Sequence, residues 1–288
     1  MGKIPDIGLK RGRQALSQMG HEERLSFIAE GLPLILASSR GFWDAARALG
    51  ASPREAEVLE GFAKEEAAKI LILMDAVRCP AHLLPARIGK ILRWFYDHHA
   101  RLIFAEAASW KPVDVAQLRD YVKPCLKSHY VEGYCGEYIL PNWSLYRRES
   151  QLYVDIEERD DSSHGWSTPL AHPRAFGFLT PTSLEVAEAM SALGLFTVSG
   201  LMAVSEIWGR VPFSDKETHA QAQALSKELL ERVIAEGLPG ENAENRHVSS
   251  LYDAWQLPMY DFDLKRIEVS LEELRSEQDR ILWNEIGW

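Results

Sequence analysis

The chain lacks the long apolar runs that membrane-spanning and secreted proteins carry. No stretch approaches the roughly 18 consecutive apolar residues of a spanning helix. The N-terminus, MGKIPDIGLKRGRQ, is charged and has no apolar segment of the kind found in signal peptides. We therefore expect a cytoplasmic protein that makes no contact with a membrane.

Cysteine is scarce and is not arranged in pairs. The three cysteines, Cys79, Cys125 and Cys135, are odd in number and show no C-x-x-C spacing. Such a pattern indicates neither a disulfide framework nor a thiolate zinc site. We expect reduced thiols with mainly structural roles.

Positive charge is in the minority. The chain has 32 Lys and Arg against 42 Asp and Glu, which gives a formal net charge of -10. This balance argues against a protein that coats nucleic acid through bulk electrostatics. The segment 84–111 departs from it, with five basic residues against two acidic ones, and two histidines besides. The sequence therefore leaves room for a local basic site on an acidic body.

The apolar content is high and is arranged with helical periodicity. Hydrophobic residues make up 46% of the 288 positions, enough for a sizeable core in one domain or two. The pattern predicts helices over 21–49, 52–77, 85–109, 183–207, 214–236 and 270–284. In the first of these, Gly31 and Pro33 predict a kink or a restart. Strand-like alternation is found at 151–156.

From this order of elements we expect a mainly α fold in which an aromatic-rich insertion packs on a helical bundle. The expected parts are a basic N-terminal lead (1–20), a helical core (21–125), an insertion with a small strand or hairpin (126–181) and a C-terminal helical region packed on the core (182–288).

The helix predicted over 52–77 places a carboxylate in its apolar stripe. Ser52, Pro53 and Glu55 together form a strong helix-start signal. Further along, Glu66 lies about 20° from the centre of the apolar stripe. A buried carboxylate without a partner costs several kcal/mol. Glu66 must therefore be protonated, be paired or face another subunit.

The helix predicted over 85–109 offers that partner. His98 and His99 flank its apolar face, so both helices turn ionisable groups inward. Because the connection is short, we expect the two helices to pack antiparallel, with Glu66 facing His98 or His99. Arg93 lies on another side, where an i, i+4 ion pair with Asp97 is the ordinary interpretation.

Arg93 and His98 also form an R-x4-H pattern, which is weak by itself but coincides with an inward histidine. Together with the segments WDAA (43–46), FAKEEAAK (62–69) and HHARL (98–102), it makes the chain resemble the AbiV-type abortive-infection proteins of bacteria. These are grouped with the HEPN (higher eukaryote and prokaryote nucleotide-binding) helical domains. The resemblance runs over about 34–107 and resumes with QLYVD at 151–155.

The resemblance implies an all-α HEPN-like fold, usually a homodimer, in a phage-defence setting. Many HEPN members are metal-independent ribonucleases, in which the Arg and His of the motif act on the scissile phosphate at the dimer interface. An effector of this kind would block translation when infection is sensed. We therefore expect an RNA substrate, a phage or host protein as trigger, and no metal or cofactor.

The geometry of the motif sets one condition, and the chain departs from the family pattern in two respects. On a straight helix Arg93 and His98 diverge by about 140°, so a second protomer or a helix distortion is needed to aim both at one phosphate. Pro85 places Arg93 about two turns inside its helix, whereas the family usually carries the motif near a helix start. Ala100 stands where HEPN toxins silenced by nucleotidyltransferases have a tyrosine, so silencing at that site is not supported.

The 85–109 helix also predicts how copies of the chain associate. A single helix of this length leaves Trp94 and Phe104 in solvent. We expect the chain to self-associate through the face that carries Arg93. A second protomer would also allow an arginine and a histidine of the motif to meet at one phosphate.

The candidate residues suit RNA cleavage by the neighbouring 2′-OH. His98 suits proton transfer because histidine titrates near pH ~6.5, and Arg93 suits the charge of a phosphorane because its planar fork is always charged. Glu66 would orient the histidine, as the acid of a triad orients its base. We expect Lys69, His99 and Arg101 to bind the substrate.

Each candidate also has a structural interpretation. Glu66 fits a buried ion pair with Lys69 or His98 as well as a catalytic role. A metal site at His98 and His99 is disfavoured, because adjacent helical residues diverge by about 100°. Two other functions stay open: a non-catalytic HEPN-like dimer that binds a phage or host protein, which the acidic surface favours, and a helical partner of a nucleotidyltransferase.

Overall fold

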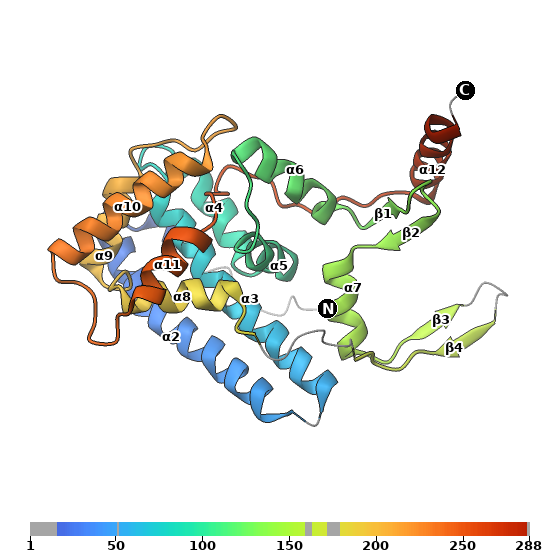
Figure 1. The fold of residues 1–288 in the computed structure, drawn as a ribbon, viewed down its shortest axis with the longest axis horizontal. Helices are drawn as coiled ribbons and strands as arrows, with labels where there is room; N and C mark the ends of the chain where they lie inside the picture. The colour runs from blue at the N-terminus through green and yellow to red at the C-terminus, as the bar shows by residue number, and fades with distance from the viewer. Residues whose placement is uncertain (1–15, 51, 159–162, 172–178, 287–288) are drawn as a thin grey trace, which may run out of the picture.

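The computed structural model describes residues 16–50, 52–158, 163–171 and 179–286, and the chain is mainly helical (Figure 1). Of the basic lead expected over 1–20, residues 1–15 lie outside the described residues. None of the helices in the described part is long and apolar enough to cross a membrane.

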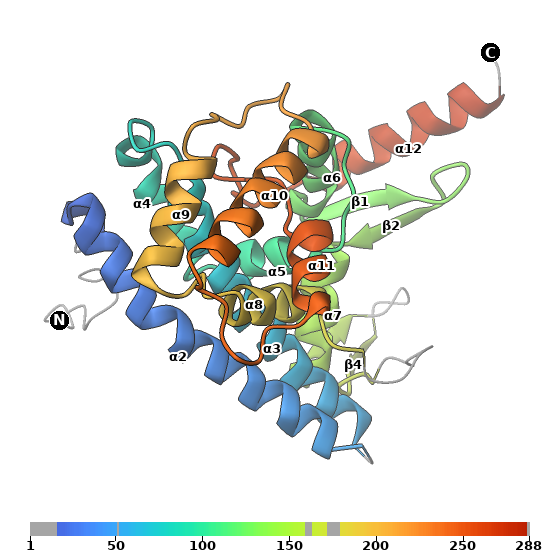
Figure 2. The ribbon, with the colours of Figure 1, turned by 60° about the vertical axis from the view of Figure 1, so that its left-hand side comes forward.

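Two long helices, α2 (His21–Ala48) and α3 (Pro53–Arg78), lie side by side along the body of the protein (Figures 1 and 2). The predicted start of α3 is confirmed, with Ser52 as the N-cap residue and a proline at the first helical position. α2 continues through Pro33, so the restart predicted there does not occur.

The helix predicted over 85–109 is interrupted. Two helices stand in its place, α4 (Leu84–Trp94) and α5 (His98–Ala107). Asp97 lies at the interruption, where its carboxylate caps α5 by accepting a hydrogen bond from the Ala100 amide at 3.1 Å. Arg101 Nε donates to the Phe95 carbonyl at 2.9 Å, which satisfies an oxygen freed near the end of α4. His98 therefore begins a helix instead of lying in the middle of one.

The interruption also buries the two aromatic residues that were expected in solvent. Trp94 is 4% exposed and Phe104 is 0% exposed. Because the chain turns between their helices, the two rings pack on each other, with centroids 5.9 Å apart. The apolar surface that predicted self-association through the Arg93 face is therefore absent.

The C-terminal half adds four helices, α8 (Thr182–Ala192), α9 (Val198–Trp208), α10 (His219–Ala235) and α11 (Asn245–Ala254). The helix predicted over 183–207 is divided because Gly194 adopts a φ of 78°. The Leu195 amide then donates to the Met190 carbonyl at 2.9 Å and closes the end of α8. The helix predicted over 214–236 starts at His219 after an N-cap threonine, and α11 was not predicted.

The hydrophobic core is centred on α3. Each residue from Ile70 to Arg78 is buried, because α2, α4, α5, α8 and α9 all contact this helix. A helix that is buried on all sides has no single inward face. This property matters for the position of the acidic residues on α3.

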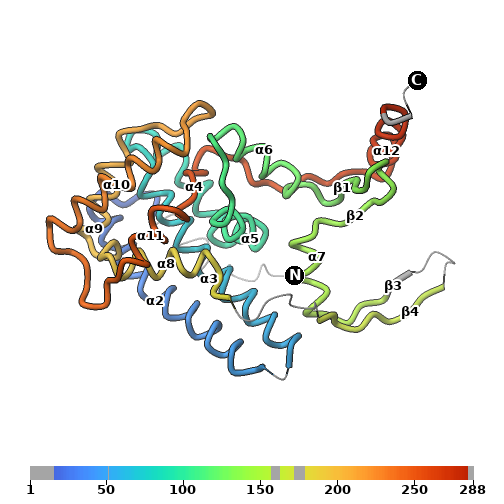
Figure 3. Tube along the Cα trace, in the orientation of Figure 1, coloured from blue at the N-terminus to red at the C-terminus, as the bar shows by residue number. Residues whose placement is uncertain are grey.

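The remaining elements are two helices that pack on the helical body, and two hairpins and a last helix that extend from it (Figures 1 and 3). They are α6 (Val115–Leu126), the antiparallel hairpin of β1 (His129–Glu132) and β2 (Tyr138–Pro141), α7 (Trp143–Leu152), the antiparallel hairpin of β3 (Ile156–Glu158) and β4 (His164–Trp166), and α12 (Leu271–Ile286). The small hairpin expected over 126–181 is present twice. The strand predicted at 151–156 is misplaced, because residues 151 and 152 complete α7 and β3 begins at Ile156.

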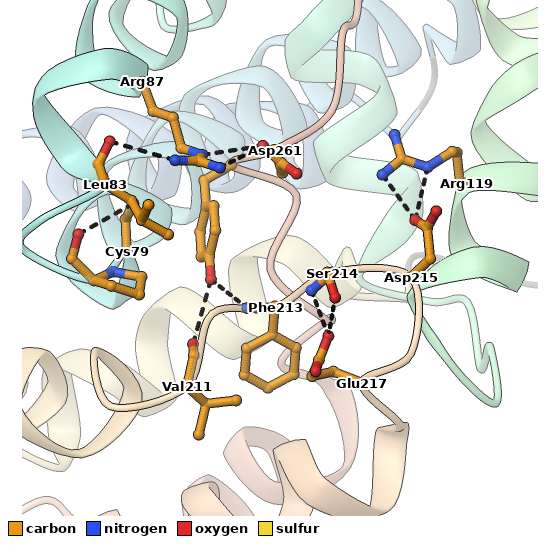
Figure 4. A network of polar contacts seen from close by, with 12 residues as sticks. Cys79, Leu83, Arg87, Arg119, Val211, Phe213, Ser214, Asp215, Glu217 and Asp261 are labelled. Carbon is orange, nitrogen blue, oxygen red and sulfur yellow. Dashed lines mark hydrogen bonds and ion pairs between the residues drawn. The ribbon is translucent and has the colours of Figure 1, made fainter.

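Polar contacts fix the segment after α11 to the core (Figure 4). Arg87 on α4 holds Asp261 at 2.8 Å. The Tyr260 hydroxyl accepts a hydrogen bond from the Phe213 amide at 2.7 Å and donates to the Val211 carbonyl at 3.4 Å. The segment therefore joins α4 to the loop that precedes α10.

Candidate functional site

A cavity of about 500 Å³ lies between α3, α5, α7 and the start of α8. Its polar wall carries carboxylates, basic residues and hydroxyls, and its apolar wall includes Phe62, Leu102 and Trp143. The volume lies within the range of small-ligand sites. The polar residues of the wall include Glu57, Glu60, Lys64, Glu65, Glu106, Ser144, Arg147, Arg148, Gln151 and Ser183.

Glu65 on α3 is the centre of the polar wall. Its side chain is only 4% exposed, yet it is surrounded by donors. Arg148 Nε donates to it at 2.7 Å, and Arg101 Nη1 lies at 3.4 Å. The third neighbour is His98 Nδ1 at 2.5 Å. The buried carboxylate is therefore compensated, as a buried charge requires.

The tautomer of His98 follows from these contacts. The Glu65 carboxylate only accepts hydrogen bonds, so His98 Nδ1 must carry the proton that it shares with Glu65. The Arg148 guanidinium, 3.2 Å from the same nitrogen, is then a neighbouring charge and not a donor to it. Nε2 is left as the basic nitrogen of the neutral ring. The side chain as a whole is 55% exposed.

A second buried carboxylate, Glu57, joins α7 to α3 beside this centre. Gln151 Nε2 donates to it at 2.8 Å, and Arg147 Nη2 lies at 3.3 Å. Together with the contact between Arg148 and Glu65, these bonds position α7 against α3. The wall of the cavity therefore depends on α7.

Glu106 on α5 completes the acidic side of the wall. Burial raises its pKa, and the hydrogen bond that the Ser144 hydroxyl donates to it opposes this effect. Burial therefore favours the protonated form of Glu106.

The contact predicted between Glu66 and the histidines is made by Glu65 instead. Glu66 forms an ion pair with Lys69, which is the structural alternative for this residue. The Lys69 ammonium in turn lies 5.5 Å from the centre of the Phe95 ring. The helical stripe pointed to Glu66 because it assumed one inward face, whereas α5 and α7 cover the neighbouring face that carries Glu65.

Arg93 is exposed and lies near the end of α4. Among the residues that the structure describes, its side chain has no hydrogen-bond or ion-pair partner. The surface pair predicted with Asp97 does not form, because that carboxylate caps α5. The structure therefore does not bring Arg93 to His98 within one protomer.

The other two predicted substrate-binding residues of α5 are buried. His99 Nε2 lies 2.7 Å from the Cys125 carbonyl and donates to it, which joins α5 to the end of α6. Arg101 reaches both Phe95 and Glu65. His99 therefore has a structural contact, whereas Arg101 belongs to the cluster around Glu65.

Sequence reasoning missed Glu57, Glu65, Arg147, Arg148 and Gln151. Three sequence features mark α7 in retrospect: Pro141, the N-cap residue Asn142, and ten following positions without Gly or Pro. Asn142 accepts a hydrogen bond from the Leu145 amide at 3.2 Å, as an N-cap residue does. The aromatic residues of this segment suggested an aromatic-rich insertion, so the helix was not predicted.

The cysteines stand apart from this site and are free thiols. Burial raises the pKa of Cys79 to about 12 and the pKa of Cys125 to about 11. Both thiols are therefore protonated near neutral pH, which makes them weak nucleophiles. Over the described ranges, no group of three or more His, Cys, Asp or Glu residues is arranged to hold a metal ion.

Comparison with known proteins adds no relative. No protein-family model matches the chain, and no curated protein or solved structure matches it. The arrangement of Glu65, His98, Arg101 and Arg148 therefore carries the functional argument, together with the sequence resemblance.

Proposed function

We propose that this chain is a metal-independent endoribonuclease in which His98 is the general base and Glu65 holds its tautomer. The contact that carries the proposal is the 2.5 Å approach of His98 Nδ1 to the buried Glu65 carboxylate, with Nε2 left free. Such a pair is the arrangement of a base and its orienting acid. The sequence resemblance supplies the setting: an abortive-infection effector of the AbiV type, acting on RNA in the cytoplasm and blocking translation.

The proposed step is an internal attack on the RNA backbone. His98 Nε2 takes the proton of a 2′-OH, and the 2′-oxygen forms a bond to the adjacent phosphorus. The bond from phosphorus to the 5′-oxygen breaks, and that oxygen takes a proton from water. The His98 imidazolium then gives its proton to the hydroxide that is left, which restores the base. The products are a 2′,3′-cyclic phosphate and a 5′-hydroxyl. Glu65 stabilises the imidazolium that forms at His98.

Arg148 is the cation of the proposed site within one protomer. Its guanidinium lies 3.2 Å from the His98 ring and lines the cavity. A fixed positive charge there favours the charge that develops on the phosphorane. Arg93, the arginine of the sequence motif, is exposed and would act from a second protomer of a HEPN-like homodimer.

A non-catalytic binding module is the second candidate. One observation favours it: the ion pairs of Glu57 and Glu65 dock α7, which is a structural role in itself. In this case the chain would bind a phage or host protein through exposed aromatic side chains near α7, such as Tyr138 and Trp166.

An RNA cleavage assay in EDTA separates the two candidates. Purified protein is incubated with RNA, alone and with infected-cell extract, and the product ends are analysed. The ribonuclease proposal predicts cleavage in EDTA with 2′,3′-cyclic phosphate or 3′-phosphate ends. If no RNA is cleaved under either condition, and a His98→Ala variant still protects cells from phage, the residues are structural and the binding module stands.

A further inference from the structure

The N-terminus of α8 closes one end of the cavity. Pro181, Thr182 and Ser183 all line it. The first amides of a helix have no partner within the helix, and the N-cap residue Pro181 offers no side-chain hydrogen bond to them. The helix has 11 residues, so its positive end adds a partial charge directed at the cavity. Uncapped amides of this kind bind anions.

Ser183 provides an independent observation at the same place. The residue is 1% exposed, and its hydroxyl has no hydrogen-bond partner among the described residues. An unmet hydroxyl in the interior costs about 1–3 kcal/mol. A buried polar group in a native structure is normally satisfied by the protein, by water or by a ligand. Ser183 is one of the residues that line the cavity, and it lies in the first turn of the same helix.

The acids of the cavity do not neutralise these donors, because each of them already has a donor of its own. Glu106 accepts from Ser144, and burial raises its pKa, which favours the uncharged form. The other three acids are paired with cations, as Glu57 with Arg147, Glu60 with Lys64 and Glu65 with Arg148. The donors at the start of α8 are therefore the unmatched groups of the cavity.

We propose that this end of the cavity binds a phosphoryl group, with its oxygens accepting hydrogen bonds from the first amides of α8 and from the Ser183 hydroxyl. The apolar wall at Phe62, Leu102 and Trp143 suits the base or sugar of the same nucleotide. That this phosphoryl group belongs to an RNA strand rests on the proposed ribonuclease function. The phosphate site itself does not depend on it.

Calorimetric titration of the full chain with adenosine 5′-monophosphate and with adenosine tests the site. Two variants remove the donors separately. Ser183→Ala removes the hydroxyl, and Thr182→Pro removes one amide at the first helical position, where proline is tolerated. Ser226→Ala is the control, because it changes a buried serine on α10, outside the cavity wall.

The monophosphate is expected to bind at least about tenfold more tightly than adenosine, and each variant is expected to remove about that factor. Ser226→Ala should leave binding unchanged. Thermal unfolding should show that Ser183→Ala is at least as stable as the original chain, because an unmet hydroxyl has been removed. Equal binding of adenosine and its monophosphate, no binding of either, or unchanged affinity in both variants would overturn the site.

A dinucleoside monophosphate, ApA, separates the two sources of a phosphoryl group. Tighter binding of the 5′-monophosphate assigns the site to a terminal phosphate, and equal binding assigns it to the phosphodiester of a chain. Failure of the site is distinct from failure of the ribonuclease proposal. If the chain binds the monophosphate through Ser183 but cleaves no RNA, the phosphate site stands and the ribonuclease proposal fails. If it cleaves RNA but does not bind the monophosphate through Ser183, the ribonuclease proposal stands and the phosphate site fails.

Discussion

The C-terminal end and the middle of α3 each place a buried carboxylate against an arginine, in two different environments. At its C-terminal end, Asp75 and Arg78 form an ion pair with both side chains 0% exposed. Arg78 lies between the rings of Trp208 and Trp255, 4.8 and 4.4 Å from their centres. In the middle of the helix, Glu65 pairs with Arg148 and with His98. Glu65 and Arg148 both line a cavity.

The pair of Asp75 and Arg78, which we call the closed pair, has only structural partners. Asp75 also accepts a hydrogen bond from the Met259 amide at 2.7 Å, and Arg78 donates to the Gln256 carbonyl at 2.8 Å. Full burial raises the pKa of Asp75 and lowers the pKa of Arg78, and the attraction between the two opposes both effects. The pair therefore holds the C-terminal segment in place and is closed to any ligand. The Glu65 cluster has an exposed histidine, which the closed pair lacks.

Removing one member of the closed pair should have the largest effect on stability. Asp75→Ala leaves Arg78 charged and unpaired in the core, which costs about 3–5 kcal/mol. Urea unfolding measures the loss. The control is Asp261→Ala, whose ion pair with Arg87 is partly exposed and is expected to contribute below about 1 kcal/mol. Equal losses of unfolding free energy in the two variants would show that the closed pair contributes no more than a partly exposed pair.

Two adjacent arginines on α7 test which contacts around Glu57 and Glu65 contribute to RNA cleavage. Arg148→Ala should slow RNA cleavage by about 10²-fold, because it removes a charge beside His98. Arg147 pairs with Glu57 instead, so Arg147→Ala should change the rate by less than about threefold. Initial rates at saturating RNA measure both. If the two variants slow cleavage equally, the arginines act only by docking α7.

Glycine substitutions compare packing in a closed region with packing at the cavity. A Cβ at Gly200 would lie 2.2 Å from the Gly194 carbonyl oxygen, so Gly200→Ala should destabilise by about 1–3 kcal/mol or more. A Cβ at Gly61, in the cavity wall, meets nothing within 4 Å. Gly61→Ala should therefore stabilise by about 0.5–1 kcal/mol through helix propensity. Urea midpoints decide the signs, and a loss in Gly61→Ala would show that the space at the cavity wall is filled.

Glu106 gives the smallest expected effect, and it depends on pH. Burial raises its pKa above the ordinary 4.5, so the unfolded chain loses this proton at lower pH than the folded chain. The stability that the protonated carboxyl contributes is complete below pH 4.5 and is lost as pH rises through the folded pKa. The gain in stability from Glu106→Gln, measured against the original chain, should therefore be larger at pH 7 than at pH 4. Glu149→Gln, an exposed change on α7, should show no such gain, and parallel pH profiles for all three proteins would contradict the assignment.

The sequence predicted the elements whose signals are local. The start of α3 followed from Ser52 and Pro53, and the helical class followed from periodicity. The interruption at Asp97 was not found, because an i, i+4 pair with Arg93 and an N-cap for α5 are both available to the same aspartate. Tertiary packing decides between them, since burial of Trp94 against Phe104 requires the chain to turn there.

The site was predicted only in part for a related reason. Periodicity identified His98 as a candidate but placed it inward, whereas its side chain is 55% exposed. It also named Glu66 where packing selects Glu65. The choice depends on α5 and α7 covering one particular face of α3, which a single helix does not encode. The contributions of Arg147 and Arg148 come from a segment more than 80 residues away in sequence from Glu65, as the contact between Arg148 and Glu65 shows. No pattern within α3 indicates them.

The most direct measurement is the RNA cleavage rate of His98→Ala, taken together with its free energy of unfolding. The side chain is 55% exposed, so its removal should change stability by less than about 1 kcal/mol. If His98 is the base, the rate should fall by about 10²-fold or more. His82→Ala, an exposed histidine before α4, should change neither quantity. A His98→Ala variant that folds normally and cleaves RNA at the original rate would contradict the account.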